Sequence, residues 1–260
     1  MANTGIRPVV ITRPQAQAAV LAQKLSALGR DAVVFPLLEI LPLPDQTTLK
    51  ATLRNVGSYA MVAFVSPNAI DAAFAHIDQW PAHVALAVVG EGSKTALAQH
   101  GLTTANATIF SPVDPLRTDS QTLIEALDLD ALRGKRVLIL RGETGRELMA
   151  DALRNHGVQV EQVAAYRREA PALDDAKKSQ LHTLLASGAD WIITSSEALR
   201  ILLQMVRDTG GEAAVVKMQQ QCLVVPHVRI AESARALGFA NIVQTGSGDE
   251  PLLAALQFRA

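Results

Sequence analysis

The sequence predicts an α/β protein of two similar lobes, each a parallel sheet flanked by helices. Short apolar runs rich in Val and Ile alternate with amphipathic stretches of helical length, a pattern typical of parallel strands joined by crossover helices. The 260 residues are more than one compact domain usually holds and suit two domains, each with its own core. Two kinds of segment also occur twice along the chain, which indicates an internal duplication.

The apolar runs divide naturally between two sheets, because a single sheet of about ten strands would be unusually large. The strands that we expect are, in chain order, 9–12, 32–35, 61–65, 85–89, 108–110, 136–140, 159–163, 191–194, 222–225 and 242–244.

The first repeated segment, the arginine unit, is an apolar strand followed by an arginine and a helix that ends at a glycine. Arg13 and Gly29 have the same spacing as Arg141 and Gly157, so the two copies align without a gap. The second repeated segment, the serine unit, is an apolar strand that ends in a hydroxyl residue and enters a helix, around residues 62–69 and 192–198. The order arginine, serine, arginine, serine does not suit one linear domain.

Two stretches mark where the chain passes between lobes: PLLEILPLP at 36–44 and YRREAP at 166–171. Proline disfavours helix and favours extended backbone, so these stretches are expected to be strand-like connectors. If both cross between lobes, the lobes are circularly permuted relatives. The alternative, two sequential domains split near Asp130, needs no double crossing. The expected division is residues 1–36 and 172–260 for lobe one, 43–165 for lobe two, and 37–42 and 166–171 for the connectors.

Composition excludes several function classes. The formal net charge is −1 with both signs interspersed, and aromatic residues are only 4%, so neither a nucleic-acid surface nor a membrane patch is expected. Cys222 is the only cysteine, which excludes an intramolecular disulfide and fits a reducing compartment. The sequence begins without a signal-peptide pattern and has no apolar run of membrane-spanning length. We therefore expect a soluble cytoplasmic protein.

Candidate binding residues follow the predicted strands. Ligands of parallel α/β sheets bind outside the carboxyl ends of strands, where helix N-termini present free N–H groups to carboxylates or phosphates. Each residue alone is also explained as a helix cap, but the repetition of such turns in two lobes favours a site. The candidates are Thr12, Arg13, Ser66, Pro67, Asn68, Gly90, Gly92, Ser93, Arg141, Gly142, Thr194, Ser195, Ser196, His227 and Arg229.

The turn at Gly90 is neither a dinucleotide fingerprint nor a phosphate loop, because a third glycine and a Gly-Lys-Ser sequence are both missing. Its counterpart in the duplication is His227, at the same distance from a helix-ending glycine. The histidines are scattered without ligand spacing, so no metal site is expected.

Tyr166 is a candidate catalytic residue. It is one of two tyrosines and falls at a predicted crossing, beside Arg167 and Arg168. In a cleft between the lobes its phenol could give a proton or a hydrogen bond to a departing oxygen. The alternative is that its ring packs against a helix and its hydroxyl meets water.

Taken in order, several motifs resemble the uroporphyrinogen-III synthase family over essentially the whole chain. They are Thr12-Arg13-Pro14, Val65-Ser66-Pro67-Asn68-Ala69, Val89-Gly90-Glu91-Gly92, Leu140-Arg141-Gly142 running to Gly157, Ala165-Tyr166-Arg167 and Thr194-Ser195-Ser196. The resemblance implies two α/β lobes joined by a two-stranded connector, with the first lobe built from both chain ends.

The resemblance also implies an activity, the cyclisation of hydroxymethylbilane with inversion of its last pyrrole ring and loss of water. Loss of the hydroxymethyl oxygen gives an azafulvene, the terminal ring attacks through its substituted carbon, and a spiro intermediate rearranges to uroporphyrinogen III. No metal or organic cofactor is implied, and the expected partner is this small molecule alone, bound by a monomer.

Residue roles are implied by the same resemblance. Tyr166 matches the tyrosine proposed to assist departure of the hydroxyl, and Ser66, Ser195 and the Gly90 turn match positions that line the cleft. Where the family often has threonine, this chain has Ser93 and Ile230.

Two other function classes compete with the enzyme. One is a two-lobed binding or regulatory protein that closes on a small anion without chemistry. The other is a nucleotide-dependent enzyme, which the missing phosphate motifs disfavour.

Overall fold

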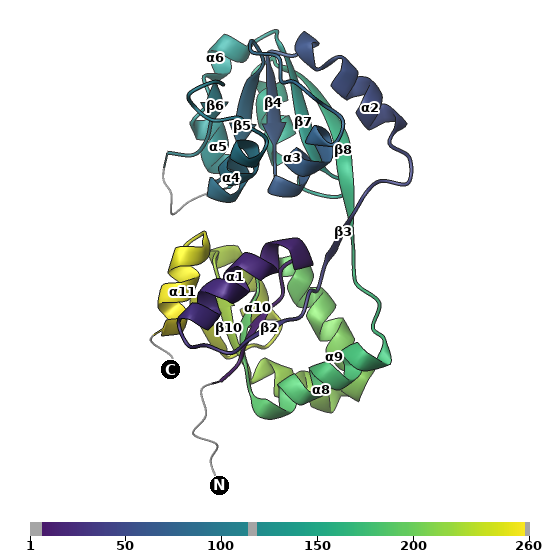
Figure 1. Cartoon of the computed structure of the whole chain (residues 1–260), viewed down its shortest axis with the longest axis vertical. Coiled ribbons are helices and arrows are strands. Elements are labelled where there is room, and N and C mark those ends of the chain that lie inside the picture. The colour runs from purple at the N-terminus through teal and green to yellow at the C-terminus, as the bar shows by residue number, and fades with distance from the viewer. Residues whose placement is uncertain (1–6, 114–118, 258–260) are drawn as a thin grey trace. The chain divides into compact units, whose positions relative to one another are not determined.

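The chain divides into two compact units. A computed structural model describes residues 7–113 and 119–257. Unit 1 combines Met1–Glu39 with Glu169–Ala260, and unit 2 is Ile40–Arg168. Figure 1 shows the purple start and the yellow end of the chain in the same unit. The alternative of a split near Asp130 is wrong, because that residue lies inside unit 2. The predicted lobes also include residues 1–6, 114–118 and 258–260, which lie outside the described residues.

Among the described residues, unit 1 holds a five-stranded sheet in the order β11-β10-β9-β1-β2, and every neighbouring pair is parallel. Its strands are β1 (Val9–Ile11), β2 (Ala32–Val34), β9 (Asp190–Ile192), β10 (Cys222–Val225) and β11 (Asn241–Gln244). Strands β1, β9 and β10 are wholly buried because helices cover both faces of the sheet.

The two faces of this sheet have separate cores. Its helices are α1 (Gln15–Ala27), α8 (Asp175–Ser187), α9 (Ser196–Gln219), α10 (Val228–Ala236) and α11 (Asp249–Gln257). One face packs on α8, α9 and α10 around Trp191, and the other packs on α1 and α11 around Ile11 and Ile192. Helix α9 is interrupted at Gly210 and Gly211, where the backbone leaves helical geometry.

Unit 2 holds a six-stranded sheet in the order β3-β8-β7-β4-β5-β6 within the part of the chain that the structure describes. Its strands are β3 (Glu39–Leu41), β4 (Met61–Phe64), β5 (Ala85–Val88), β6 (Ile109–Phe110), β7 (Arg136–Gly142) and β8 (Gln159–Glu169). Alternate residues of β4 face opposite cores: Val62 and Phe64 lie in one, Met61 and Ala63 in the other.

The helices of unit 2 flank both faces. They are α2 (Thr47–Arg54), the 3₁₀ turn η1 (Val56–Ser58), α3 (Pro67–Phe74), α4 (Glu91–Gln99), α5 (Ser120–Glu125), α6 (Leu129–Leu132) and α7 (Leu148–Asn155). One face packs against residues of α2, α3 and α4, and the other against residues of α5 and α7.

The two sheets share one topology. The order β11-β10-β9-β1-β2 of unit 1 corresponds to β6-β5-β4-β7-β8 of unit 2. The arginine strands (β1, β7) are therefore central and lie next to the serine strands (β4, β9) in both units. The glycines that end the helices of the arginine units, Gly29 and Gly157, both have positive φ, 71° and 78°. This left-handed conformation strains residues other than glycine, which explains why both copies keep a glycine there.

Both stretches expected to be strand-like contain strand residues. The strand predicted at 159–163 is longer than expected, continues to Glu169 and includes Tyr166. The segment 37–42 contains the short strand β3, which lies next to β8 at the edge of the sheet.

Candidate functional site

The carboxyl ends of β4 and β7, with the residue of β8 that faces them, bring Ser66, Gly142 and Tyr166 together. Phe64, the last residue of β4, pairs with Leu140 of β7, so Ser66 comes level with Gly142 two residues further on. A register shift between Arg141 and Gly142 then pairs Gly142 with Tyr166 of β8. The irregularity thus aligns the tyrosine with the other two residues in one row.

Tyr166 is buried in the core of unit 2, with 4% of its surface exposed. Its phenolic oxygen lies 3.0 Å from Ser66 Oγ. The ring is packed, as in the alternative reading, and its hydroxyl meets Ser66, which follows β4, the second strand from β8.

Ser66 itself is fixed by the helix that it begins. Its Oγ accepts a hydrogen bond from the backbone N–H of Ala69 at 3.2 Å, and Pro67 occupies the first helical position. Serine before proline favours this arrangement, because the serine hydroxyl accepts from a free N–H of the first helical turn, and proline has no N–H that would need an acceptor. The helix-capping role predicted for Ser66 is confirmed.

Gly142 makes room for the phenol. A Cβ at this position would lie 3.2 to 3.3 Å from the ring carbons Cζ and Cε2 and the oxygen of Tyr166. That contact is tighter than ordinary van der Waals packing, so a side chain here would push the hydroxyl end of the ring. The tyrosine therefore depends on a glycine in the facing strand.

The Gly90 turn follows the next strand, β5, and begins α4. Gly90 occupies the N-cap position with extended backbone, and a Cβ on Gly92 would lie 3.7 Å from the Pro67 ring. This turn therefore lies beside the Ser66 turn. Ser93 is 4% exposed within α4, so its hydroxyl faces the protein rather than solvent. Asn68 is half-buried in the first turn of α3.

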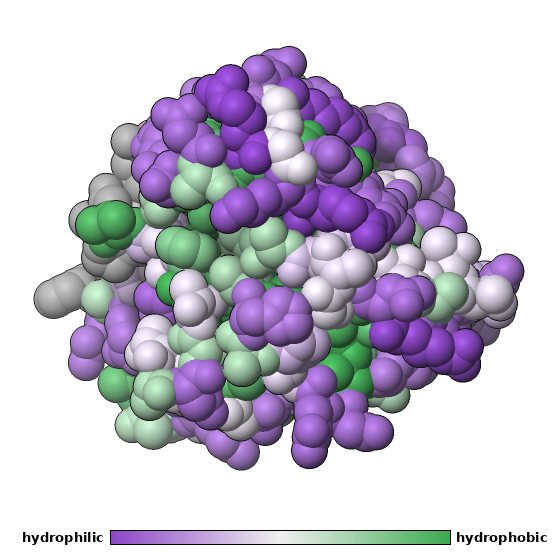
Figure 2. All heavy atoms as spheres, turned by 90° about the horizontal axis from the view of Figure 1, so that it is seen from above, coloured by the Kyte–Doolittle hydropathy of each residue, from purple (hydrophilic) through white to green (hydrophobic). Residues whose placement is uncertain are grey.

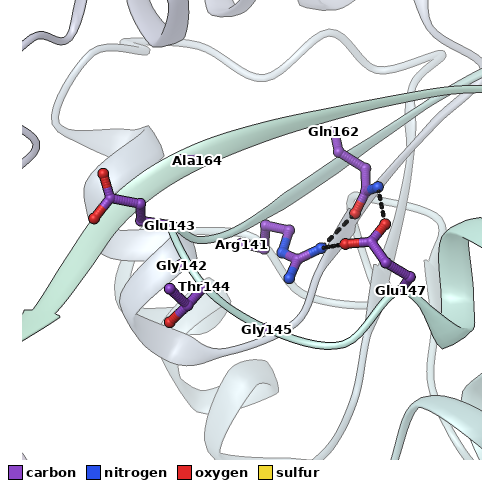
Figure 3. A pocket seen from close by; sticks show the side chains of 8 residues that line it. All are labelled: Arg141, Gly142, Glu143, Thr144, Gly145, Glu147, Gln162 and Ala164. Carbon is purple, nitrogen blue, oxygen red and sulfur yellow. Dashed lines mark hydrogen bonds and ion pairs between the residues drawn. The ribbon is translucent and has the colours of Figure 1, made fainter.

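Arg141 lies in a polar pocket of about 420 Å³ beside this row. Figure 3 shows one end of its guanidinium pointing toward Glu147 and Gln162. Nη1 donates to Glu147 Oε1 at 2.5 Å and to Gln162 Oε1 at 2.7 Å, and Gln162 Nε2 donates to Glu147 Oε2 at 2.5 Å. The pocket is lined by Arg141, Gly142, Glu143, Thr144, Gly145, Glu147, Gln162 and Ala164.

This closed ring of hydrogen bonds fixes one corner of the guanidinium. The bond from Gln162, and then the one from Arg141, hold the pKa of the Glu147 carboxyl below its usual range. The Arg141 side chain is 11% exposed. A Cβ on Gly145 would lie 2.6 Å from Arg141 Nη2, so only glycine leaves the space at that edge open. The Nε–Nη2 edge is the one that binds a carboxylate through two hydrogen bonds.

Unit 1 repeats the serine turn without the tyrosine. Ser195 Oγ accepts from the backbone N–H of Ala198 at 3.0 Å and caps α9, as Ser66 caps α3. Thr194 and Ser196 flank it, and Ser196 Oγ lies 2.9 Å from Ser233 Oγ of α10. The residue of unit 1 that corresponds to Tyr166 is Leu38, which is buried and has no hydroxyl. The serine turns of the two units therefore differ in chemistry.

The arginine turn of unit 1 is occupied by interactions within the unit. Thr12 is 2% exposed and donates to the carbonyl of Ile192 at 2.6 Å, which ties β1 to β9. Arg13 Nη1 pairs with Asp249 Oδ1 of α11 at 2.6 Å, and Lys24 lies 3.6 Å from the same carboxylate. These contacts hold the last helix against the first, so a structural role accounts for both candidates.

The third turn of unit 1 places His227 at the N-cap position of α10, with the same extended backbone as Gly90. The predicted equivalence of these two residues is confirmed. His227 Nδ1 lies 3.5 Å from Ser247 Oγ, and Arg229 is exposed in the first turn. Ile230 is 1% exposed in the core of unit 1, so the residue that replaces a family threonine serves packing here.

Sequence reasoning missed the residues that surround Arg141. Glu147, Gln162 and Gly145 are not part of a recognisable motif, and their roles appear only when β7, β8 and the loop before α7 come together. One signal was present: Gly142 and Gly145 follow an arginine strand within a few residues, and close glycines there allow a ligand or side chain to approach the backbone.

The described residues contain no cluster of His, Cys, Asp or Glu suited to a metal ion. No helix in the described ranges has the length and apolar character needed to cross a membrane. On the face in Figure 2, hydrophilic and hydrophobic residues are intermixed, as the composition suggests.

Comparison with known proteins identifies the family. The model for the family described as "Uroporphyrinogen-III synthase HemD" matches residues 19–253. The chain belongs to the uroporphyrinogen-III synthase family. A uroporphyrinogen-III synthase of Salmonella typhimurium is 33% identical over 257 residues, covering 96% of this chain and 99% of the relative. One from Escherichia coli is 31% identical over 254 residues, with the same coverage. The predicted family and its assignment as a lyase of tetrapyrrole biosynthesis are confirmed.

Solved uroporphyrinogen III synthases share the fold. The structure from Helicobacter pylori has a TM-score of 0.59 at 15% identity, covering 97% of this chain and 99% of that one. A mutant enzyme from Thermus thermophilus gives 0.57 at 13% identity, with 97% and 98% covered. The predicted α/β class with two parallel sheets is confirmed.

Proposed function

We propose that this chain converts hydroxymethylbilane to uroporphyrinogen III, with Tyr166 as its catalytic residue. The observation that carries the proposal is the pairing of the Tyr166 phenol with Ser66, level with the carboxyl ends of β4 and β7, the edge where parallel α/β proteins bind ligands.

Tyr166 acts as a general acid in this scheme. Its proton passes to the hydroxymethyl oxygen, the C–O bond breaks, and water leaves as the nitrogen of the pyrrole ring that bears the hydroxymethyl group supplies electrons. The last ring attacks through its substituted carbon, and the spiro intermediate rearranges. The proton that the new ring junction loses returns to the phenolate, so the net change is loss of one water. Because electron-rich pyrroles react readily, orientation of the bilane is the main task of the protein.

The acetate and propionate groups of the substrate need hydrogen-bond donors, and the turns at the strand ends of each unit supply several. Residues Ser66 to Asn68, Gly90, Gly92 and the Ser93 turn of unit 2 present helix N-termini, as do residues 194–196 and His227 with Arg229 in unit 1. Free N–H groups at such ends bind carboxylates without extra lysines. Arg141 adds its Nε–Nη2 edge beside Gly142. Thr12 and Arg13 contribute by supporting the turn, since their side chains are engaged within unit 1.

We further propose that 37–42 and 166–171 connect the units, and that the protein is a cytoplasmic monomer that binds no nucleic acid. The neighbouring positions of β3 and β8 support the connector assignment. The near-neutral net charge supports the absence of nucleic-acid binding, and the single cysteine supports a cytoplasmic location.

Replacing Tyr166 by phenylalanine tests the catalytic assignment. We expect Tyr166→Phe to lower kcat by about tenfold to a thousandfold, the usual range for a general acid, with KM little changed. Tyr59→Phe, which removes the other tyrosine from the opposite end of the sheet, is the matched control and should keep kcat. An unchanged kcat in Tyr166→Phe would assign the ring to packing. A wild-type protein that binds the bilane but returns it unaltered would support the non-catalytic binding protein instead.

A further inference from the structure

The donor in the hydrogen bond between Ser66 and Tyr166 becomes fixed during the reaction. In the resting protein either hydroxyl can donate across the 3.0 Å separation. Once Tyr166 has given its proton to the substrate, the phenolate can only accept, so Ser66 must donate. A hydrogen bond to a charged oxygen is about twice as strong as one between neutral groups. The contact therefore strengthens as the reaction proceeds.

Ser66 is prepared for this donation by its place at the start of α3. Its oxygen already accepts from the Ala69 N–H, which leaves its own proton free for Tyr166. The N-terminus of the eight-residue helix carries partial positive charge, which favours a negative phenolate nearby. Gly142, on the strand between them, has no side chain and so leaves room for the phenol to lie beside Ser66.

The duplication supplies an internal comparison. Ser195 caps α9 with nearly the same geometry as Ser66, because each Oγ accepts from a backbone N–H three residues later, at 3.0 Å for Ser195 and 3.2 Å for Ser66. At the position of the repeat that matches Tyr166, unit 1 has Leu38, which carries no hydroxyl. Capping alone therefore accounts for the serine of unit 1, and the serine of unit 2 has an additional partner.

We infer that Ser66 is a positioning residue for the reaction, whose hydroxyl orients the Tyr166 phenol and stabilises the phenolate formed when the substrate hydroxyl departs. This inference rests on the proposed function. It assigns to Ser66 a role through Tyr166 that differs from direct binding of a substrate carboxylate. The two roles predict different kinetics, because an interaction made only in the transition state changes kcat, whereas uniform binding changes KM.

The kinetic test uses Ser66→Ala and Ser66→Thr. We expect Ser66→Ala to lower kcat by about a hundredfold, the lower end of the loss seen when a donor to a developing oxyanion is removed, with KM within about twofold. Ser66→Thr keeps a capping hydroxyl and should restore most of kcat. Asp128→Ala is the control for loss of a cap, because Asp128 caps α6 of the same unit and touches no candidate site residue. It should keep kcat.

A spectroscopic test reads the contact without substrate. The chain has two tyrosines, so tyrosine labelled with ¹³C at Cζ gives two resonances, and Tyr59→Phe assigns the one from Tyr166. Ser66→Ala should shift this resonance, whereas Asp128→Ala should leave it in place. An unmoved resonance, or a Ser66→Ala variant that changes KM and not kcat, would overturn the inference. Absence of type III product from the wild type would instead overturn the proposed function, while the resonance still decides whether Ser66 orients the phenol.

Discussion

A buried ion pair joins the two ends of the chain in unit 1, and its removal is predicted to destabilise that unit severely. Arg30 Nη2 lies 3.1 Å from Asp190 Oδ2, with side chains that are 2% and 1% exposed. The same guanidinium donates to the carbonyls of Arg7 and Leu256. One cation thus ties the segment before β1, the start of β9 and the end of α11 together.

The magnitude follows from burial. Arg30→Met leaves the Asp190 carboxylate in the interior without its cation, and removing one partner of a buried pair costs about 3–5 kcal/mol. Domains are stable by only about 5–15 kcal/mol, so unit 1 should lose a large share of its stability. Arg30 Nε is buried with no acceptor in the described part of the chain. Because the pair is incompletely satisfied, Arg30→Met combined with Asp190→Leu should cost much less than the two single changes added.

Urea unfolding followed by tryptophan fluorescence measures these costs. Trp191 is fully buried next to Asp190 in unit 1, and Trp80→Phe leaves it as the single tryptophan of the chain. Arg207→Met is the control, because the Arg207–Glu212 pair of the same unit is 45% and 73% exposed and should contribute less than about 1 kcal/mol. The reasoning is refuted if Arg30→Met costs no more than Arg207→Met, or if the double variant equals the sum of the singles.

Two further predictions concern unit 2. Gly145→Ala should displace Arg141 from Glu147 and Gln162 and raise KM about tenfold, because charged hydrogen bonds are lost. Gly57→Ala is the control and should leave KM unchanged, because its Cβ would lie 3.7 Å from His83, an ordinary contact. An unchanged KM in Gly145→Ala would remove Arg141 from the binding proposal. Burial, and then the hydrogen bond to Glu161, raises the pKa of Tyr59 to about 12. Since the unfolded pKa is about 10, the stabilisation by Tyr59 is complete below pH 10 and is lost as pH rises toward 12. Tyrosinate absorbance of Tyr166→Phe should therefore titrate near 12 when folded and near 10 in denaturant, and a folded midpoint near 10 would contradict the burial argument.

The fold was largely predictable because its strands are short apolar runs and its duplication keeps register. The equivalence of Gly90 and His227 was predicted from their equal spacing to a helix-ending glycine, and both residues occupy N-cap positions. The serine caps were equally predictable, because serine before a helix has one favoured interaction. Local sequence is sufficient where local hydrogen bonding decides the structure.

The site was less predictable because its contacts join distant segments. The extension of β8 through Tyr166 depends on pairing with β7 across a register shift, which no local pattern reveals. The partner of Arg13 is distant in sequence, because Asp249 comes from the last helix, and the partner of Arg141 is Glu147, just before α7. Which carboxylate meets which arginine is decided by tertiary packing.

The isomer of the cyclised product tests the central claim most directly. Hydroxymethylbilane closes without inversion when no enzyme controls it, so purified protein titrated against a fixed amount of freshly formed bilane competes with that background. We predict that the fraction of type III uroporphyrinogen rises with protein concentration toward completion, and that Tyr166→Phe requires far more protein for the same fraction. Type I product alone at every protein concentration would contradict the account.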